Sequence, residues 1–269
     1  MAHIQCVFYS KSLKKNTIVQ VILPTPSADD FLADKSTDYF QDTDYYRTLY
    51  LLHGSYGGCT DWLRRTSVER YAEERKLAVV MPSGENSGYL NMHHGENYLE
   101  FIGSELPEFM RMLILPLSPN REDTYIAGLS MGGYGAFRIA LEYHETFGYA
   151  ASISGVLDLN VLTDTGPHIT KMPSNSRRAG GLWDIGNISE DDDLVFLLKK
   201  RLENKTVLPK MYACCGMEDF LLSASESFVK KARELGAEIV YGTHAGTHDW
   251  DYWDTHIKDV MDWLVEKNI

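Results

Sequence analysis

A serine flanked by glycines is the residue in this chain best placed to act as a nucleophile. Ser130 lies at the centre of Gly128–Gly132, which fits the pattern G-x-S-x-G. The apolar run Thr124–Leu129 precedes it, and small and apolar residues at helical spacing follow it. This context predicts a strand, a sharp turn that presents the serine, and a helix whose N-terminal amides stabilise negative charge on a substrate. The alternative is a glycine-rich turn in an ordinary α/β protein.

A serine hydroxyl barely ionises near neutral pH, so it needs a base, and two later segments supply candidates. Asp219 and His248 follow predicted strands and complete the chain order serine, acid, histidine. Glu218 is a second candidate acid and His244 a second candidate base. Asp219 is favoured because the apolar run after it would shield its carboxylate. His248 is favoured because it lies in a tight turn just before the last predicted helix.

A second glycine-rich stretch, His53–Gly58, directly follows the buried apolar run Thr48–Leu52. Loops at the carboxyl ends of central strands are where open α/β sheets bind ligands. Backbone N–H groups in such a loop stabilise the oxyanion that forms during acyl transfer. We therefore expect the N–H groups of Ser55 and Met131 to form an oxyanion hole. The alternative is a loop that needs its glycines only to turn.

Composition narrows the function classes. The chain has 269 residues, 44% of them hydrophobic, and a net charge of -12. This length suits one α/β domain over residues 1–269, and the acidic balance argues against a nucleic-acid or anionic-membrane partner. No apolar run is long enough to span a bilayer and the N-terminus does not resemble a secretory signal, so a cytoplasmic location is predicted. The four cysteines include no C-x-x-C pair, and the adjacent His93 and His94 lack a third ligand, so no metal site is expected.

Strand and helix signals alternate along the chain, which predicts a mostly parallel central sheet with helices on both faces. Residues 25–46 are polar and acidic and are expected to form an exposed loop. Strands are expected at residues 3–10, 16–23, 48–52, 77–82, 124–129, 147–155, 209–216 and 237–241. Helices are expected at residues 66–75, at 96–117 with a bend near Pro107, directly after Ser130, from about Ser189, at 223–235 and at 250–265.

Residues 156–208 break this alternation and are interpreted as a cap insertion that covers the site and shapes substrate choice. A helix is expected to begin near Ser189, because acidic residues follow that serine and basic residues come at the other end. Trp183 and Met172 within the insertion, and Trp250 beside His248, are candidate substrate-binding residues. Trp183 and Met172 could instead simply pack the insertion.

Several blocks of the chain resemble the tributyrin esterase group of bacterial α/β-hydrolases, which is related to the S-formylglutathione hydrolases (esterase D) and to feruloyl and acetylxylan carbohydrate esterases. The blocks run nearly from end to end, and the H-x-W-x-x-W pattern in the last one is specific. They are Leu51–Gly54, Asp61–Trp62, Ala127–Gly135, Cys215–Leu221 and Gly246–Trp253. The segment from Val156 to Leu208 matches poorly.

The resemblance implies the α/β-hydrolase fold with Ser130 as nucleophile, Asp219 as acid and His248 as base. It also implies oxyanion amides at Ser55 and Met131, short acyl substrates and assembly as a homo-oligomer, and no metal or organic cofactor is expected. The predicted function is hydrolysis of carboxylic esters with acetyl to butyryl groups, on a sugar or small alcohol, through an acyl-enzyme. Alternatives are an S-formylglutathione-type thioesterase, a feruloyl esterase and, from a different class, a non-catalytic binding module, although such modules usually lack a triad residue.

Overall fold

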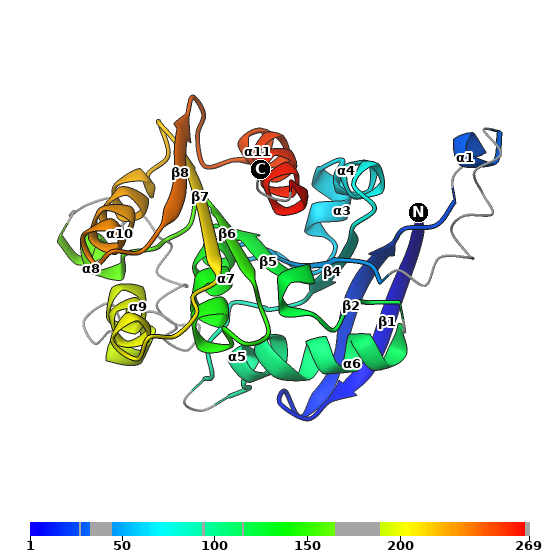
Figure 1. Ribbon diagram of the computed structural model, residues 1–269, viewed down its shortest axis with the longest axis horizontal. Helices are drawn as coiled ribbons and strands as arrows, with labels where there is room; N and C mark the ends of the chain where they lie inside the picture. The colour runs from blue at the N-terminus through cyan, green and yellow to red at the C-terminus, as the bar shows by residue number, and fades with distance from the viewer. Residues whose placement is uncertain (27, 33–44, 93–94, 115, 165–188, 267–269) are drawn as a thin grey trace.

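One sheet forms the centre of the molecule in the computed structural model, which describes residues 1–26, 28–32, 45–92, 95–114, 116–164 and 189–266 (Figure 1). Among these residues, eight strands lie in the order β1-β2-β4-β3-β5-β6-β7-β8. They are β1 (Ala2–Ser10), β2 (Lys15–Leu23), β3 (Thr48–Leu52), β4 (Ala78–Pro82), β5 (Thr124–Leu129), β6 (Tyr149–Ile153), β7 (Lys210–Gly216) and β8 (Ile239–His244). The pairs β1–β2 and β2–β4 are antiparallel and the others are parallel, which confirms the predicted mostly parallel sheet.

Helices cover both faces of this sheet (Figure 1). The described helices are α1 (Ala28–Leu32), α3 (Asp61–Arg65), α4 (Val68–Glu74), α5 (Tyr98–Glu100), α6 (Leu106–Leu113), α7 (Met131–Glu142), α8 (Leu159–Asp164), α9 (Leu194–Glu203), α10 (Leu222–Glu234) and α11 (Trp250–Val265). Residues of α3, α4 and α11 form one hydrophobic core on the sheet, and residues of α6, α7, α9 and α10 form the other.

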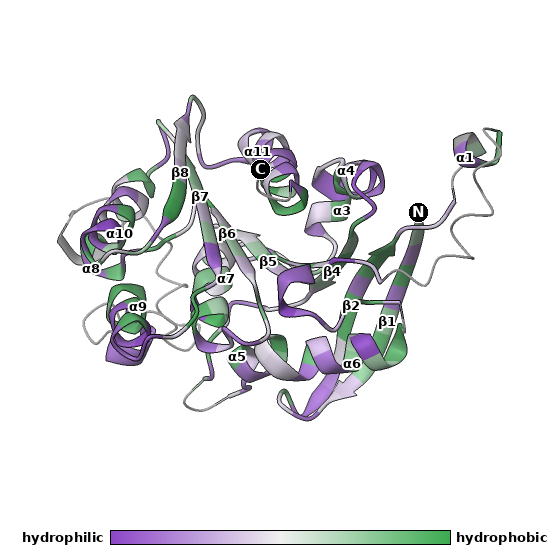
Figure 2. Ribbon diagram, viewed as in Figure 1, coloured by the Kyte–Doolittle hydropathy of each residue, from purple (hydrophilic) through white to green (hydrophobic). Residues whose placement is uncertain are grey.

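The central strands separate these two cores because successive side chains of a strand point to opposite faces. In β3, Leu49 and Leu51 belong to the core under α4 and α11, whereas Tyr50 and Leu52 belong to the core under α7. All of β3 is buried, as its continuous apolar run predicted. The surrounding helices carry both hydrophilic and hydrophobic residues, the pattern of helices with one face on a core (Figure 2).

The carboxyl ends of the parallel strands meet at one edge of the sheet. Leu52, at the end of β3, pairs with Gly128, and Leu129, at the end of β5, pairs with Ile153. Strand β4, which follows β3 in the chain, lies on one side of β3, and β5 lies on the other side. Open α/β sheets bind ligands at such a switch point in the strand order. The loop His53–Gly58 and the turn at Ser130 both begin there.

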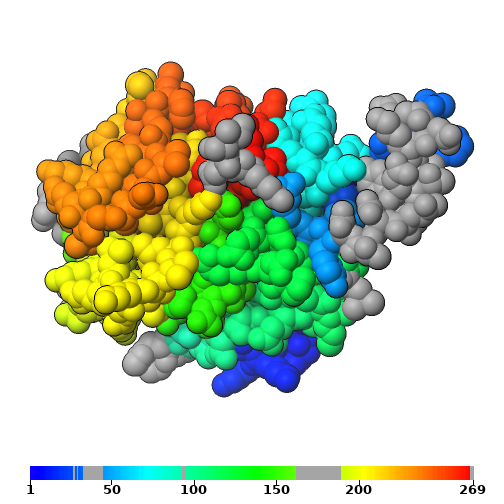
Figure 3. Space-filling model, viewed as in Figure 1, coloured from blue at the N-terminus to red at the C-terminus, as the bar shows by residue number. Residues whose placement is uncertain are grey.

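Helix α11 carries the end of the chain across to the first helices. It lies beside α3 and α4 (Figure 3) and packs on β6 and β7. Asp254 accepts hydrogen bonds from the Ser67 N–H at 2.9 Å and the Tyr71 hydroxyl at 3.3 Å. Asp262 forms an ion pair with Arg75 at 2.5 Å. These contacts hold the helix that directly follows the loop containing His248.

The structure differs from the expected elements at several boundaries. Helix α1 forms within the stretch expected to be a loop, of which residues 33–44 lie outside the described residues. Helix α3 was not expected. The helix expected at 96–117 consists of α5, a π-helical segment Phe101–Glu105 and α6, which ends at Leu113. Pro107 lies in the first turn of α6, where a residue without an N–H is tolerated.

Two differences concern the segments around the site. Strand β8 continues to His244, which was expected in a loop, because Gly216 at the end of β7 pairs with it. Helix α9 begins at Leu194, and its cap is Asp193, whose carboxylate accepts the N–H groups of Val195 and Phe196. Ser189 instead precedes a short 3-10 turn. The side chain that can reach the first free amides of the helix decides where the helix starts.

Candidate active site

The turn between β5 and α7 holds Ser130 in a strained conformation. Its φ is 53° and its ψ is -117°, in a region that non-glycine residues rarely adopt. The Ser130 N–H donates to Ile153 O at 2.9 Å, which ties the turn to β6. A Cβ atom at Gly128 would lie 2.4 Å from Gly132 O, and one at Gly132 would lie 2.6 Å from His53 O. Glycines are therefore required on both sides of Ser130 because backbone segments approach closely there.

His248 connects the other two members of the predicted triad. Its Nε2 lies 3.0 Å from Ser130 Oγ. Its Nδ1 lies 3.0 Å and 2.9 Å from the two carboxylate oxygens of Asp219. A carboxylate only accepts, so in the neutral ring Nδ1 carries the proton and Nε2 is free to accept the serine proton. The structure thus brings together three side chains that are far apart in the sequence.

The carboxylate of Asp219 is buried, with 0% of its side chain exposed. Besides facing His248, its Oδ1 accepts the Leu221 N–H at 2.8 Å. The alternative acid, Glu218, is exposed, and its Oε2 accepts the Gly246 N–H at 2.7 Å. Glu218 therefore joins the loop after β7 to the loop after β8, while Asp219 faces the imidazole.

The alternative base, His244, lies at the end of β8 and has other partners. Its Nδ1 is 3.5 Å from the Tyr252 hydroxyl, and its ring stacks on that of His256 with centroids 4.3 Å apart. Burial lowers the pKa of His256. His256 lies on the buried face of α11. No hydrogen bond joins His244 to Ser130 or Asp219 in the described part of the chain.

Two aromatic side chains flank His248. The Phe220 ring lies 4.6 Å from the imidazole, centroid to centroid, and the Trp253 ring lies 5.0 Å away at 89°. Phe220 is 54% exposed, whereas Trp253 is buried. The sequence places Phe220 next to Asp219 and Trp253 one helical turn after Asp249. Their contact with the imidazole, however, depends on the fold.

Backbone N–H groups are available beside Ser130. Gly54 lies close to the turn, because a Cβ atom added there would be 3.4 Å from Ser130 Cβ. Within the described residues, the N–H groups of Ser55 and Met131 have no hydrogen-bond acceptor. Met131 is also the first residue of α7, where the helix dipole favours negative charge. Both positions are consistent with the predicted oxyanion hole.

The candidate substrate-binding residues are only partly described. Trp250 packs edge-on against Trp62 and Trp253, with centroids 5.5 Å and 5.1 Å apart, and the Arg65 guanidinium lies over its ring. A role for Trp250 in binding substrate stays a prediction. Trp183 and Met172 lie outside the described residues.

Other kinds of site can be assessed for the described residues alone. They contain no group of three or more His, Cys, Asp or Glu side chains that could hold a metal ion. They also contain no helix that is long and apolar enough to cross a membrane. His93 and His94 lie outside this part of the chain.

Comparison with known proteins identifies the family. The family model described as "Putative esterase" matches residues 10–264. The chain belongs to this esterase family. An acetyl esterase of Caldicellulosiruptor saccharolyticus is 36% identical over a 277-residue alignment that covers 98% of both chains.

Solved structures agree with the family assignment. The substrate-bound fluorophosphonate-binding serine hydrolase FphF of Staphylococcus aureus is 32% identical to this chain. The match covers 99% of each chain and has a TM-score of 0.82. The S-formylglutathione hydrolase FrmB of the same organism is 31% identical to this chain. The match covers 98% of this chain and 99% of the FrmB chain, with a TM-score of 0.80. A ferulic acid esterase, at 22% identity and a TM-score of 0.75, shares the fold. This member of the esterase family is thus a serine ester hydrolase with the α/β-hydrolase fold.

Proposed function

We propose that Ser130, His248 and Asp219 are the catalytic triad of this esterase. The observation that carries the proposal is His248, whose two ring nitrogens lie 3.0 Å from Ser130 Oγ and 2.9 Å from Asp219 Oδ2. In this arrangement the imidazole takes the serine proton as the hydroxyl attacks the ester carbonyl, and returns it to the leaving alcohol. The buried carboxylate holds the imidazole tautomer and stabilises the imidazolium.

The proposed reaction passes through an acyl-enzyme. Attack by Ser130 Oγ produces a tetrahedral intermediate whose oxyanion is stabilised by the N–H groups of Ser55 and Met131. Expulsion of the alcohol leaves the acyl group on Ser130. A water molecule, deprotonated by His248, then attacks this acyl group and releases the acid. No metal or organic cofactor enters these steps.

Short acyl groups, from acetyl to butyryl, are the proposed substrates, with a sugar or a small alcohol as the other part of the ester. The acetyl esterase that is 36% identical to this chain supports the acyl choice. Residues 156–208 are proposed to be an insertion in the single domain 1–269 that shapes substrate choice.

Replacement of Ser130 tests the triad directly. Ser130→Ala is expected to lower kcat for nitrophenyl acetate and butyrate by at least about a thousandfold, because the nucleophile is removed. The same variant is expected to lose labelling by a fluorophosphonate probe. Ser223→Ala, at the start of α10, is the control and should retain both properties. Undiminished ester hydrolysis by Ser130→Ala would refute the proposal.

A thioesterase of the S-formylglutathione type is the second candidate. It is supported by the 31% identity and the TM-score of 0.80 to the S-formylglutathione hydrolase of Staphylococcus aureus. Side-by-side measurement of kcat/KM for S-formylglutathione and for acetylated sugars separates the two activities. A higher value for the thioester would assign the chain to the thioesterases.

We further propose that the esterase is cytoplasmic and that it assembles as a homo-oligomer, as its resemblance to the tributyrin esterase group implies for the assembly. Light scattering tests the assembly, because a monomer has a mass of 30.5 kDa.

A further inference from the structure

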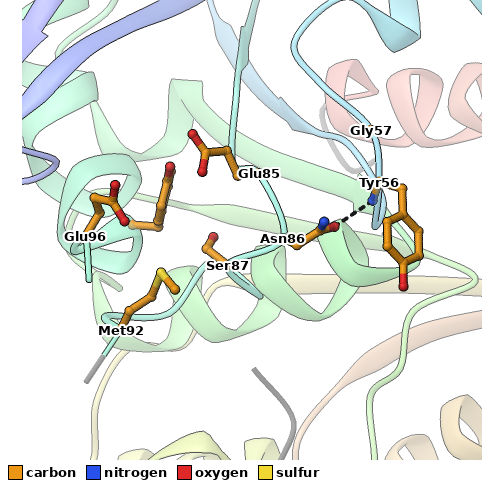
Figure 4. Close-up of a pocket in the computed structure, with 8 residues that line it drawn as sticks. Tyr56, Gly57, Glu85, Asn86, Ser87, Met92 and Glu96 are labelled. Carbon is orange, nitrogen blue, oxygen red and sulfur yellow. Dashed lines mark hydrogen bonds between the residues drawn. The ribbon is translucent and has the colours of Figure 1, made fainter. Parts of the chain in front are cut away.

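The loop that contains Ser55 is held by a second segment, Gly84–Tyr89, which follows β4. Hydrogen bonds join the two segments on both sides of Ser55. On the N-terminal side, the Gly84 N–H donates to His53 Nε2 at 2.8 Å and the Tyr89 hydroxyl donates to His53 O at 2.8 Å. On the C-terminal side, the Tyr56 N–H donates to Asn86 Oδ1 at 2.7 Å (Figure 4).

The N-terminal side of this attachment is buried and rigid. His53 is 1% exposed, and burial lowers the pKa of its imidazole, which keeps the ring neutral. Since Nε2 accepts from Gly84, the proton lies on Nδ1, 2.7 Å from Gly54 O. Tyr89 is fully buried as well. Close packing therefore fixes the residues before Ser55.

The C-terminal side is different, because it lies at the surface. Tyr56 has a φ of 62°, an unfavourable value for a residue with a side chain, and its side chain is 68% exposed. Packing therefore does little to hold this conformation. The Gly57 N–H donates to Gly54 O at 3.2 Å, within the loop itself. Among the described contacts, the bond to Asn86 is the one that attaches the strained Tyr56 backbone to another segment.

These bonds leave the N–H group of Ser55 free. The N–H groups of Tyr56 and Gly57 have acceptors, whereas that of Ser55 has none among the described residues. A donor that stabilises an oxyanion must already point to the position where charge develops, because reorientation during the reaction would cost part of its effect. The free N–H of Ser55 belongs to the peptide unit next to the one that Asn86 holds.

We propose that Asn86 is a positioning residue for the oxyanion hole. By holding Tyr56, it fixes the direction of the Ser55 N–H and so raises kcat, with little effect on binding of the uncharged ground-state ester. This inference rests on the proposed function, because it takes Ser130 as the nucleophile and Ser55 as an oxyanion donor. A glycine-rich loop alone would not have identified Asn86, which is 31 positions after Ser55 in the chain.

The surroundings of Asn86 make the inference testable. Asn86 is exposed and, with Tyr56 and Met92, lines a cavity of about 520 Å³ that none of Ser130, Asp219 and His248 lines (Figure 4). Truncation of an exposed side chain leaves no hole in a core, so the fold should tolerate Asn86→Ala.

Asn86→Ala is expected to lower kcat for nitrophenyl acetate by about tenfold to a hundredfold, since small displacements of catalytic groups have effects of this size. KM should change by less than about twofold, because the lost interaction operates in the transition state. The inhibition constant of a short trifluoromethyl ketone, which forms a tetrahedral oxyanion adduct with serine, should rise in proportion to the fall in kcat. Asn86→Asp keeps the acceptor oxygen and should recover most of kcat.

Asn91→Ala is the matched control. Asn91 belongs to the same stretch of chain, and its Oδ1 also accepts a backbone N–H, that of Glu100 at 3.2 Å, but this bond does not involve the loop at Ser55. This variant should retain the kcat of the wild type. The inference is overturned if Asn86→Ala behaves like Asn91→Ala, if KM rises while kcat stays, or if Asn86→Asp loses as much activity as Asn86→Ala. Activity in Ser130→Ala would instead refute the proposed function.

Discussion

His248 is constrained from three directions. Asp219 accepts from its Nδ1, the Phe220 ring lies on one side at 4.6 Å and the Trp253 ring meets it edge-on at 5.0 Å. With Nδ1 held by a buried carboxylate, the other nitrogen points to Ser130. The imidazole therefore has the orientation that the proposed proton transfer requires, and an orientation held in this way avoids a cost of reorganisation during the reaction.

Replacement of the two neighbouring carboxylates should give very different results. Asp219→Asn keeps the size of the side chain but allows the wrong imidazole tautomer, so kcat should fall by roughly a thousandfold or more. Glu218→Gln keeps an oxygen that can accept the Gly246 N–H, and kcat should stay within about fivefold of the wild type. Steady-state kinetics with nitrophenyl acetate measures both. Equal losses in the two variants would contradict the assignment of Asp219 as the triad acid.

At the scale of elements, the turn between β5 and α7 depends on backbone segments that nearly touch. The sites of contact are Gly128 against Gly132, and Gly132 against the carbonyl of His53. The segments that follow β7 and β8 also approach each other closely, since a Cβ atom at Gly216 would lie 2.2 Å from Gly246 O. The loops that carry the acid and the histidine are thus fixed to one another by their backbones as well as by Glu218.

Gly128→Ala tests the close approach at the turn. The new methyl group would meet backbone atoms that cannot rotate away, so the free energy of unfolding should fall by about 1–3 kcal/mol or more and kcat should fall with it. In a protein of this size that corresponds to a drop in Tm of at least about 2–4 °C. Gly58→Ala is the control, because a Cβ atom there has nothing within 4 Å. A Gly128→Ala variant with wild-type Tm and kcat would show that the turn is more adaptable than the structure implies.

At the scale of the whole molecule, the sheet brings distant segments to one edge. Ser130, Asp219 and His248 follow the strands β5, β7 and β8, and each of these strands is followed by a helix. Right-handed crossovers between parallel strands place successive carboxyl ends side by side. Loops after several parallel strands can therefore contribute to one site, and the loops after β5, β7 and β8 carry Ser130, Asp219 and His248.

Burial of His53 predicts how the stability of the molecule depends on pH. Its pKa is lowered from the ordinary value of 6.5, so the folded protein keeps this ring neutral at pH values where the unfolded chain binds a proton. Well above pH 6.5 the ring is neutral in both states and contributes no dependence of stability on pH. As the pH falls below that value, the free energy of unfolding should fall by up to about 1.4 kcal/mol per pH unit from this group, until the folded-state pKa is reached.

Urea denaturation between about pH 5 and pH 7.5 measures this contribution. Burial also lowers the pKa of His256, so the pH dependence of the wild type alone does not separate the contribution of His53 from that of His256. His53→Gln cannot titrate, and the difference in unfolding free energy between wild type and variant should shrink as the pH falls below 6.5. A difference that stays constant with pH would refute the assigned cause.

Local patterns predicted much of the fold and the composition of the candidate site. Mostly apolar runs identified β3, β4, β5 and β7, because a strand covered on both faces is apolar along most of its length. Boundaries were less predictable: His244 extends β8 through pairing with β7, and Asp193 rather than Ser189 caps α9. In both cases a neighbour in space, or the reach of one side chain, determines where the element ends.

The amino-acid sequence by itself determined which side chains could meet at the site, because the glycines around Ser130 and the strand ends before Asp219 and His248 are local features. The local sequence favoured Asp219 over Glu218 and His248 over His244, and the tertiary structure showed that Asp219 faces the imidazole of His248 and that His248 faces Ser130. It also revealed that Asn86 accepts a hydrogen bond from Tyr56, in the loop that contains Ser55. Adjacent residues differ little in local pattern but point in different directions once folded, and a hydrogen bond between separate loops exists only after the sheet has brought them together.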